Sequence, residues 1–271
     1  MSSSHLTIIT GASRGLGLAL ARQLLQPGHT LILVSRNVHP QLSAPPGARL
    51  EQWQHDLADA ALAAERLREW LADQPPARHA SATLINNAGV MPPIVPLSQS
   101  ADAAGQAALA TALRVGLEAP MLLSAVFLSA TGHWKAPRKV LNISSGLGRR
   151  PMASTAAYCA AKAGMDHFTR CLALEEAGKP QGARVCALAP GVIDTDMQVQ
   201  LRGAQASDFP DHARFVQLKQ AHALASTDAA AQRVLAWLHR ADFGAEPVAD
   251  LRSLDAGIPP MARHGGNGAA R

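Results

Sequence analysis

The sequence predicts an α/β protein built on a doubly wound parallel sheet of about seven strands, with helices on both faces. Short aliphatic and β-branched runs alternate with longer Ala- and Leu-rich segments along most of the 271-residue chain. Strands that alternate with helices in this way favour a parallel sheet. A glycine-rich turn also follows the first strand-like run, at the position where open α/β sheets bind phosphate groups.

The first unit is a strand, a glycine turn and a helix. Leu6–Thr10 is a β-branched run, and the helix is expected over Leu18–Gln26. Between them stand glycines at 11, 15 and 17, with the spacing GxxxGxG rather than GxGxxG. Glycines let the backbone approach a pyrophosphate, which the helix N-terminus attracts. Such turns are common on their own, so the position after the first strand gives this one its weight.

The end of the second strand, Thr30–Ser35, bears on cofactor choice. NAD-specific folds usually carry an acidic residue here, which holds the ribose 2′-hydroxyl. This chain has Arg36 instead, and Arg14 lies in the glycine turn. Two guanidiniums can clamp a 2′-phosphate. We therefore predict NADP(H) as cofactor; the alternative is that either arginine is simply solvated.

The remaining elements follow from the same signals. One domain is expected over residues 1–263, with the polar, less periodic segment 195–225 as a mobile substrate lid and 264–271 as a disordered tail. Strands are expected at Arg49–His55, Ala82–Ile85, Lys139–Ile143, Arg184–Leu188 and Pro247–Asp250, and helices at Ala58–Ala72, Gln106–Ser129, Ala153–Ala177 and Ser226–Arg240.

Composition narrows the class of protein. The net charge is +5, but no Lys/Arg run is interleaved with aromatic residues, so no nucleic-acid partner is expected. The three cysteines show no CxxC spacing, which indicates reduced thiols in a cytoplasmic protein. The longest apolar run considered, Met121–Ala130, is too short to span a bilayer. No membrane partner is therefore expected.

Tyr158 is the only tyrosine, and Lys162 follows it by four residues in a segment with helical character. At this spacing the phenol and the ammonium share one face of a helix. A phenol has a pKa near ~10, and a fixed cation nearby lowers that pKa toward the range useful for proton transfer. The alternative is a half-buried tyrosine and a solvated lysine that share a face by chance.

Together these motifs resemble the short-chain dehydrogenase/reductase family, whose members have a Rossmann-like fold. The match covers about residues 6–197. It rests on Thr10-Gly11-xxx-Gly15-x-Gly17, Asn86-Asn87-Ala88-Gly89, Ser145, Tyr158-xxx-Lys162 and Pro190-Gly191, in the family's order and spacing.

The resemblance implies an NADPH-dependent reductase of a small-molecule carbonyl. Tyr158 would protonate the carbonyl oxygen, Lys162 would lower the tyrosine pKa and hold the nicotinamide ribose, and Ser145 would bind the substrate oxygen. Ser144 is the neighbouring alternative and is more plausibly structural. The cofactor would contact Gly11, Ser13, Arg14, Gly15, Leu16, Gly17, Arg36, Asp56, Leu57, Asn87, Ala88, Gly89, Tyr158, Lys162, Pro190, Gly191, Ile193 and Thr195.

Two stretches, 172–176 and 189–198, are similar to sepiapterin reductases and to benzil-type diketone reductases. In sepiapterin reductases an aspartate near the C-terminus anchors the pterin, and Asp250 falls roughly at that place. The alternative reading of Asp250 is a carboxylate at the end of a surface strand. The family also commonly forms homodimers or homotetramers through the helices expected here at 106–129 and 155–177.

One departure concerns the catalytic Asn that the family usually places in the long helix, where it supports a water in the proton relay. Here the context reads Val115-Gly116-Leu117. A glycine inside a helix costs roughly 1 kcal/mol, and the space beside it can admit a water. The competing hypothesis is therefore an NADP(H)-binding sensor or scaffold with weak turnover.

Overall fold

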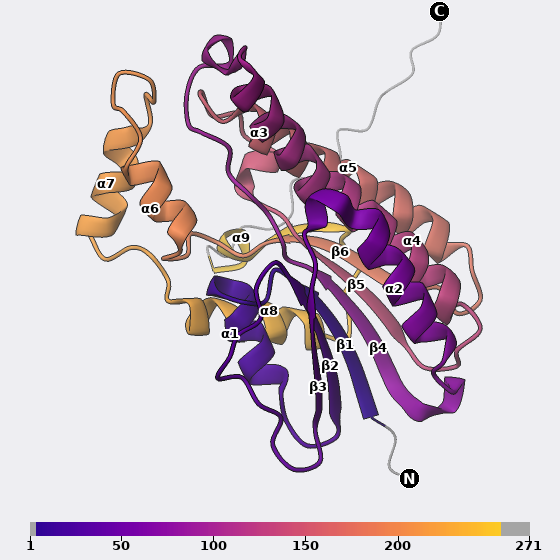
Figure 1. Ribbon diagram of the computed structural model, residues 1–271. Helices are drawn as coiled ribbons and strands as arrows, with labels where there is room; N and C mark the ends of the chain where they lie inside the picture. Colours follow the sequence, from indigo (N-terminus) through magenta and orange to yellow (C-terminus); the bar gives the residue numbers. More distant parts are fainter. Residues whose placement is uncertain (1–3, 256–271) are drawn as a thin grey trace, which may run out of the picture.

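The computed structural model, which describes residues 4–255, contains a parallel sheet of seven strands in the order β3-β2-β1-β4-β5-β6-β7 (Figure 1). The strand order turns back between β1 and β4, which opens a crevice at the carboxyl ends of these strands. The predicted doubly wound sheet is confirmed. Its strands are β1 (Ser4–Thr10), β2 (His29–Ser35), β3 (Arg49–Gln54), β4 (His79–Asn86), β5 (Arg138–Ile143), β6 (Arg184–Ala189) and β7 (Val248–Asp250).

Helices cover both faces of the sheet: α1 and α8 lie on one face, and α2, α4 and α5 on the other (Figure 1). Successive strand residues point to opposite faces, so Ile9 packs in the core under α1 and α8, and Ile8 in the core under α2, α4 and α5. Burial on both faces explains the unbroken aliphatic run of β1. The helices are α1 (Gly15–Leu24), α2 (Ala60–Ala72), α3 (Ala103–Leu113), α4 (Ala119–Thr131), α5 (Ala156–Ala177), α6 (Asp196–Arg202), α7 (His212–Gln220), α8 (Thr227–His239) and α9 (Leu251–Asp255).

The structure corrects the continuous helix expected over 106–129. A π-helical turn at Arg114–Glu118 separates α3 from α4. Gly116 is buried in that turn, and a Cβ added to it would lie 3.0 Å from the Cβ of Ala161 on α5. Pro120 has no backbone N–H, so the carbonyl of Gly116 cannot accept the usual α-helical hydrogen bond from it. The proline therefore gives a direct reason for a break in regular α-helix here.

The combined run Ala103–Thr131 is long and apolar enough, by length and composition alone, to cross a membrane. The shorter run Met121–Ala130, taken alone, is too short to span a bilayer. The inner side of the combined run packs on the sheet, where Leu123 and Phe127 are 1% and 0% exposed. Core burial therefore accounts for the apolar residues on this inner side.

The segment 195–225, expected to be irregular, contains α6 and α7, which stand apart from the sheet (orange in Figure 1). Its two ends meet at its base, where Ile193 forms an isolated bridge with Ala225. The Asp194 amide donates to the Ala225 carbonyl at 2.9 Å. Lys219 Nζ donates to the Asp194 carboxylate at 2.6 Å. The segment is thus closed on itself at the edge of the body.

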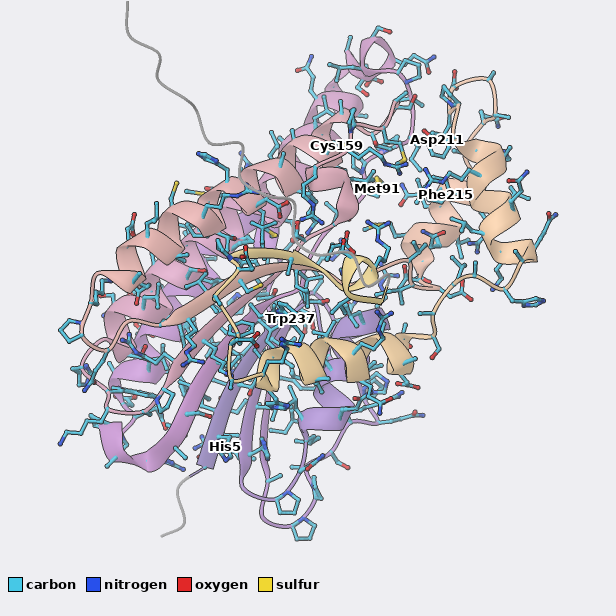
Figure 2. The ribbon with its side chains drawn as sticks, turned by 180° about the vertical axis from the view of Figure 1, so that it is seen from behind. His5, Met91, Cys159, Asp211, Phe215 and Trp237 are labelled. Atoms are coloured by element: carbon cyan, nitrogen blue, oxygen red, sulfur yellow. The ribbon has the colours of Figure 1, made fainter. Side chains whose placement is uncertain are left out.

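An apolar cluster joins this segment to the rest of the molecule. Phe209 and Phe215 belong to it, together with Met91 from the loop after β4 and Tyr158 from α5. Figure 2 shows Met91 and Phe215 at this junction, far from Trp237 of α8. The segment therefore shares an apolar cluster with the tyrosine that the sequence singles out. The tail 264–271 lies outside the described residues.

Candidate active site

The turn after β1 forms a tight backbone cradle at the start of α1. Gly11 has a φ of +67°, and a Cβ on it would lie 2.8 Å from Ala88 Cα. A Cβ on Gly17 would overlap the carbonyl oxygen of Gly11. Asn87 Nδ2 donates to the carbonyls of Thr10 and Gly11 at 2.9 and 3.1 Å, which fastens the turn to the end of β4. Only glycine fits these positions, and the cradle suits the close approach of a phosphate.

Two arginines lie at the edge of this cradle. Arg36 is exposed and makes no hydrogen bond or ion pair with any residue in 4–255. Arg14 pairs with Asp196 at 2.6 Å, with both side chains 70% exposed. Exposed pairs of this kind contribute little, so a phosphate can compete for Arg14. Asp56 accepts from the Ala58 amide at 3.0 Å and caps the next turn.

One cavity of about 900 Å³ lies along the carboxyl ends of the strands. Ser145 and every residue predicted to contact the cofactor line it, although they come from seven separate loops and helices of the chain. Asp250 is the predicted site residue that does not line it. The same space is lined by Met197, Leu201, Phe215 and Leu218 of the segment 195–225. The sequence prediction and the geometry therefore select the same place.

Tyr158 lies near the start of α5 and is 7% exposed. Burial raises the pKa of Tyr158 to about 12, while a hydrogen bond with the Ser145 side chain acts in the opposite direction. The Nζ of Lys162 lies 5.8 Å from the centre of the Tyr158 ring and does not reverse this shift. The i, i+4 spacing led us to expect a lowered pKa for Tyr158, but in the structure this pKa is raised. The phenol is therefore protonated at neutral pH.

Lys162 is 3% exposed and donates to the carbonyl of Ile143 at 2.7 Å. Burial lowers the pKa of Lys162 to about 8, and the negative charge of Asp166 acts in the opposite direction. The alternative of a solvated lysine is therefore excluded. Its ammonium lies between the end of β5 and α5, on the wall of the same cavity as Tyr158.

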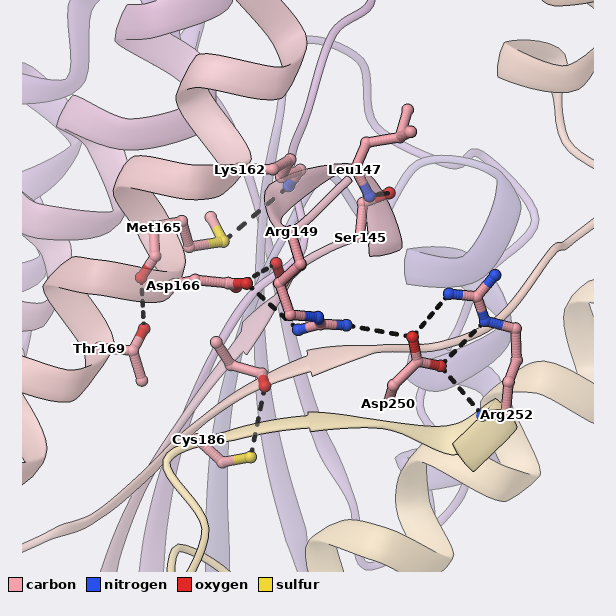
Figure 3. A network of polar contacts seen from close by, with 12 residues as sticks. Ser145, Leu147, Arg149, Lys162, Met165, Asp166, Thr169, Cys186, Asp250 and Arg252 are labelled. Atoms are coloured by element: carbon pink, nitrogen blue, oxygen red, sulfur yellow. Dashed lines mark hydrogen bonds and ion pairs between the residues drawn. The ribbon is translucent and has the colours of Figure 1, made fainter. Parts of the chain in front are cut away.

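A polar network lies behind the turn that follows β5 (Figure 3). The Ser144 hydroxyl donates to Asp166, a carboxylate of α5 that is 2% exposed. Arg149 bridges Asp166 and Asp250 with N–O distances of 3.2 and 3.1 Å. Arg252 donates to both carboxylate oxygens of Asp250. Ser144 therefore holds a buried side chain of the fold, as the alternative reading of this residue proposed. The network connects α5 to the end of β7.

Arg149 and Arg252 belong to the site but were not predicted from the sequence. Arg149 reaches a partner 101 residues away, a separation that carries no sequence signal. Arg252 also lines the cavity. The π-helical turn, by contrast, had a readable signal, because Pro120 stands inside an otherwise helical pattern.

A substitution series can test the packing around Gly116. In Gly116→Ala, the new methyl group meets Ala161 at 3.0 Å, and we expect the free energy of unfolding to fall less when Ala161→Gly is also present. The expected coupling between the two sites is about 1 kcal/mol. Denaturant unfolding of both single variants and the double variant measures it. Strict additivity would show that α5 does not confine position 116.

Comparison with known proteins decides the family. The family model described as short chain dehydrogenase matches residues 5–206, which include the glycine turn, Ser145, Tyr158 and Lys162. The chain belongs to the short-chain dehydrogenase family. The benzil reductase ((S)-benzoin forming) of Bacillus cereus is 36% identical over 243 residues, covering 87% of this chain and 94% of the relative. The sepiapterin reductase of Meriones unguiculatus is 32% identical over 251 residues, covering 87% and 92%. The resemblance predicted from the motifs is confirmed.

Solved structures of this family share the fold. The KRED1-Pglu enzyme superposes with a TM-score of 0.74 at 26% identity, over 90% of this chain and 99% of that chain. A metagenomic short-chain oxidoreductase in complex with NADP gives a TM-score of 0.66 at 26% identity, over 92% and 96%. This chain is therefore an oxidoreductase of the short-chain dehydrogenase/reductase type.

Proposed function

We propose that this short-chain dehydrogenase reduces the carbonyl group of a small ketone or aldehyde with NADPH. The observation that carries the proposal is the shared cavity, whose wall holds Ser145, Tyr158 and Lys162 beside the glycine cradle. Bound NADPH would supply the hydride. The glycine turn at the start of α1 would hold its phosphates, and unpaired Arg36 offers a cation for a 2′-phosphate.

Each catalytic group has a defined task in this proposal. Tyr158 is protonated at neutral pH and donates its phenolic proton to the carbonyl oxygen as negative charge develops there. Ser145, already hydrogen-bonded to the phenol, orients the same oxygen. The Lys162 ammonium stabilises the phenolate that the tyrosine becomes. The segment 195–225 covers the outer end of the cavity as a lid and excludes water.

The contacts of Asp250 favour a diketone over a pterin. The name of the Bacillus relatives points to a 1,2-diketone and that of the vertebrate relatives to sepiapterin. A pterin anchored on Asp250 would have to displace Arg149 and Arg252, which occupy both carboxylate oxygens. Burial raises the pKa of Asp250, but hydrogen bonds from Arg252 outweigh this and hold it below its ordinary value. We therefore place diketones first among the candidate substrates.

The direct test is consumption of NADPH by the purified protein with benzil, other vicinal diketones, sepiapterin and simple aldehydes, with NADH in parallel. Turnover with NADPH and little with NADH supports the proposal. Tight NADPH binding without turnover across the panel would support the sensor hypothesis, which the buried Gly116 motivates.

The pH dependence of reduction should reflect Lys162. Because burial lowers the pKa of Lys162 to about 8, its positive charge is lost as pH rises through that value. We expect kcat/KM for NADPH to fall by up to about tenfold per pH unit above this point. Tyr158 stays protonated to about pH 12 and does not cause this fall.

A steady-state pH profile between about pH 6 and 10, together with Lys162→Arg, measures the effect. Arginine keeps its charge throughout this range, so the alkaline fall should disappear in the variant even if its overall rate is lower. An unchanged fall in Lys162→Arg would assign the titration to another group.

We also propose that the chain forms a homodimer or homotetramer through the outer faces of α3, α4 and α5. Leu113, Met121 and Leu174 are 41%, 43% and 78% exposed there. Burial of such side chains against a second copy is favourable. Light scattering should give a mass of two or four chains, and the mass of one chain would contradict the proposal.

A further inference from the structure

Arg252 is a cavity-lining cation for which neither cofactor binding nor proton transfer gives a role. It lies in α9, directly after β7, and lines the same cavity as Ser145 and Tyr158. Its Nε and Nη2 donate to the two Asp250 carboxylate oxygens at 3.0 and 2.6 Å. Its Nη1 has no acceptor among the side chains described, those of residues 4–253, or among the described backbone. Since a guanidinium carries five N–H donors, the two on Nη1 remain available to a ligand.

The network behind it fixes this guanidinium. The Arg252 backbone amide also donates to Asp250, at 3.0 Å. Asp250 in turn is held by Arg149, which is anchored on the buried carboxylate of Asp166 (Figure 3). A donor held in this way loses little conformational entropy when it binds an acceptor. The Arg252 side chain is 49% exposed, so a guanidinium held by its ion pair with Asp250 is still accessible to a ligand.

The Arg252 guanidinium is also close to the proposed site of reaction. A Cβ on Gly146 would overlap its Nη2, so the guanidinium lies directly against this residue. Gly146 directly follows Ser145, the proposed ligand of the reacting carbonyl oxygen. The Cγ of Arg252 lies 3.8 Å from the place that a Cβ on Gly191 would take. Arg252 therefore packs between the turns that follow β5 and β6.

The charge and polarity of this corner favour an oxygen acceptor. The carboxylates of Asp166 and Asp250 pair with the guanidiniums of Arg149 and Arg252. Lys162 and Arg150 add further positive charge to the cavity lining. The cavity wall also contributes apolar side chains. It includes Met91, Leu147, Met197, Leu201 and Phe215. A ligand with apolar groups and a second oxygen near the reacting carbonyl matches this wall.

We propose that Arg252 donates a hydrogen bond from Nη1 to a second carbonyl oxygen of the substrate, on the carbon next to the reacting carbonyl. Arg252 thereby selects vicinal dicarbonyls over simple ketones. The inference rests on the proposed carbonyl reductase function, and it adds the residue that reads the second oxygen. Asp250 is then a positioning residue that acts through Arg252.

A pair of substrates isolates this hydrogen bond. Benzil and deoxybenzoin have the same two phenyl groups and differ by the second carbonyl oxygen. In Arg252→Met, kcat/KM for benzil should fall about 10- to 100-fold, the effect expected for loss of a hydrogen bond to a charged group. The value for deoxybenzoin should change less than about threefold. Arg252→Lys keeps the positive charge but loses the paired N–H donors of the guanidinium. Its kcat/KM for benzil should lie between those of the wild type and Arg252→Met.

Binding without turnover gives an independent readout. In the Tyr158→Phe background with NADPH bound, adding Arg252→Met should raise the Kd of benzil about 10-fold or more and leave the Kd of deoxybenzoin unchanged. Arg68→Met is the matched control, because Arg68 lies on α2, outside the cavity, and pairs with Glu65. It should alter neither value.

The outcomes separate this inference from the function on which it rests. A wild type that reduces no carbonyl compound overturns both. If the wild type is active but Arg252→Met lowers kcat/KM equally for benzil and deoxybenzoin, or for neither, only the role of Arg252 is overturned. Loss of NADPH affinity in Arg252→Met would assign the arginine to the cofactor and also overturn it.

Discussion

Replacing Tyr158 by phenylalanine is expected to lower kcat for carbonyl reduction by about 100- to 10,000-fold, the usual contribution of a positioned general acid. Phenylalanine keeps the aromatic ring in its apolar cluster and removes only the proton donor. The Kd of NADPH should therefore change little. Single-turnover kinetics at saturating NADPH and benzil measure the loss on the chemical step.

Cys159→Ser is a suitable control for this substitution. Cys159 neighbours Tyr158 on α5 and is partly buried, but it does not line the cavity. It should retain most of the wild-type rate. A Tyr158→Phe variant that also kept most of its rate would show that another group protonates the substrate, and the assignment of Tyr158 would be wrong.

The charge reversal Arg36→Glu is expected to lower kcat/KM for NADPH by at least about 100-fold and to make NADH the better cofactor. Arg36 has no partner within residues 4–255, so its charge is free to meet a 2′-phosphate. A hydrogen bond to a charged group contributes about 1.5–3 kcal/mol, and the new carboxylate adds repulsion. A glutamate can instead accept from the 2′-hydroxyl of NADH. Steady-state kinetics with both cofactors test this.

Arg22→Glu makes the same change in net charge on exposed α1 surface outside the cavity, and it should leave the cofactor ratio unchanged. If Arg36→Glu retained the wild-type ratio, Arg14 would become the better candidate for the 2′-phosphate. Arg14 would first have to break its ion pair with Asp196, which costs little free energy because the pair is exposed.

The sheet and the glycine cradle were predictable because local sequence dictates them. A strand such as β1 is buried on both faces and must be aliphatic throughout. Gly11 and Gly17 are required by close backbone contacts within one loop and with β4. Tyr158 and Lys162 lie one helical turn apart, so their shared face followed from the spacing alone. In each case the deciding interactions span few residues or repeat with a fixed period.

Other features depend on distant partners, and the sequence did not predict them. The α7 helix buries only Phe215, so its polar sequence shows no helical period. The raised pKa of Tyr158 comes first from burial, which the i, i+4 spacing cannot report. The contacts of Asp250 with Arg149 join residues 101 positions apart. Such networks become visible only when the fold brings the elements together.

The bridge between Ile193 and Ala225 has an evolutionary consequence. The stretch between these residues leaves and rejoins the body at one point, and it contributes no strand to the sheet. Mutation, insertion or recombination within this contiguous part of the coding sequence can remodel the outer cavity wall. The phosphate cradle and the proton donor, encoded elsewhere, remain intact. Descendants of one ancestral scaffold can thus acquire new substrates without re-inventing the chemistry.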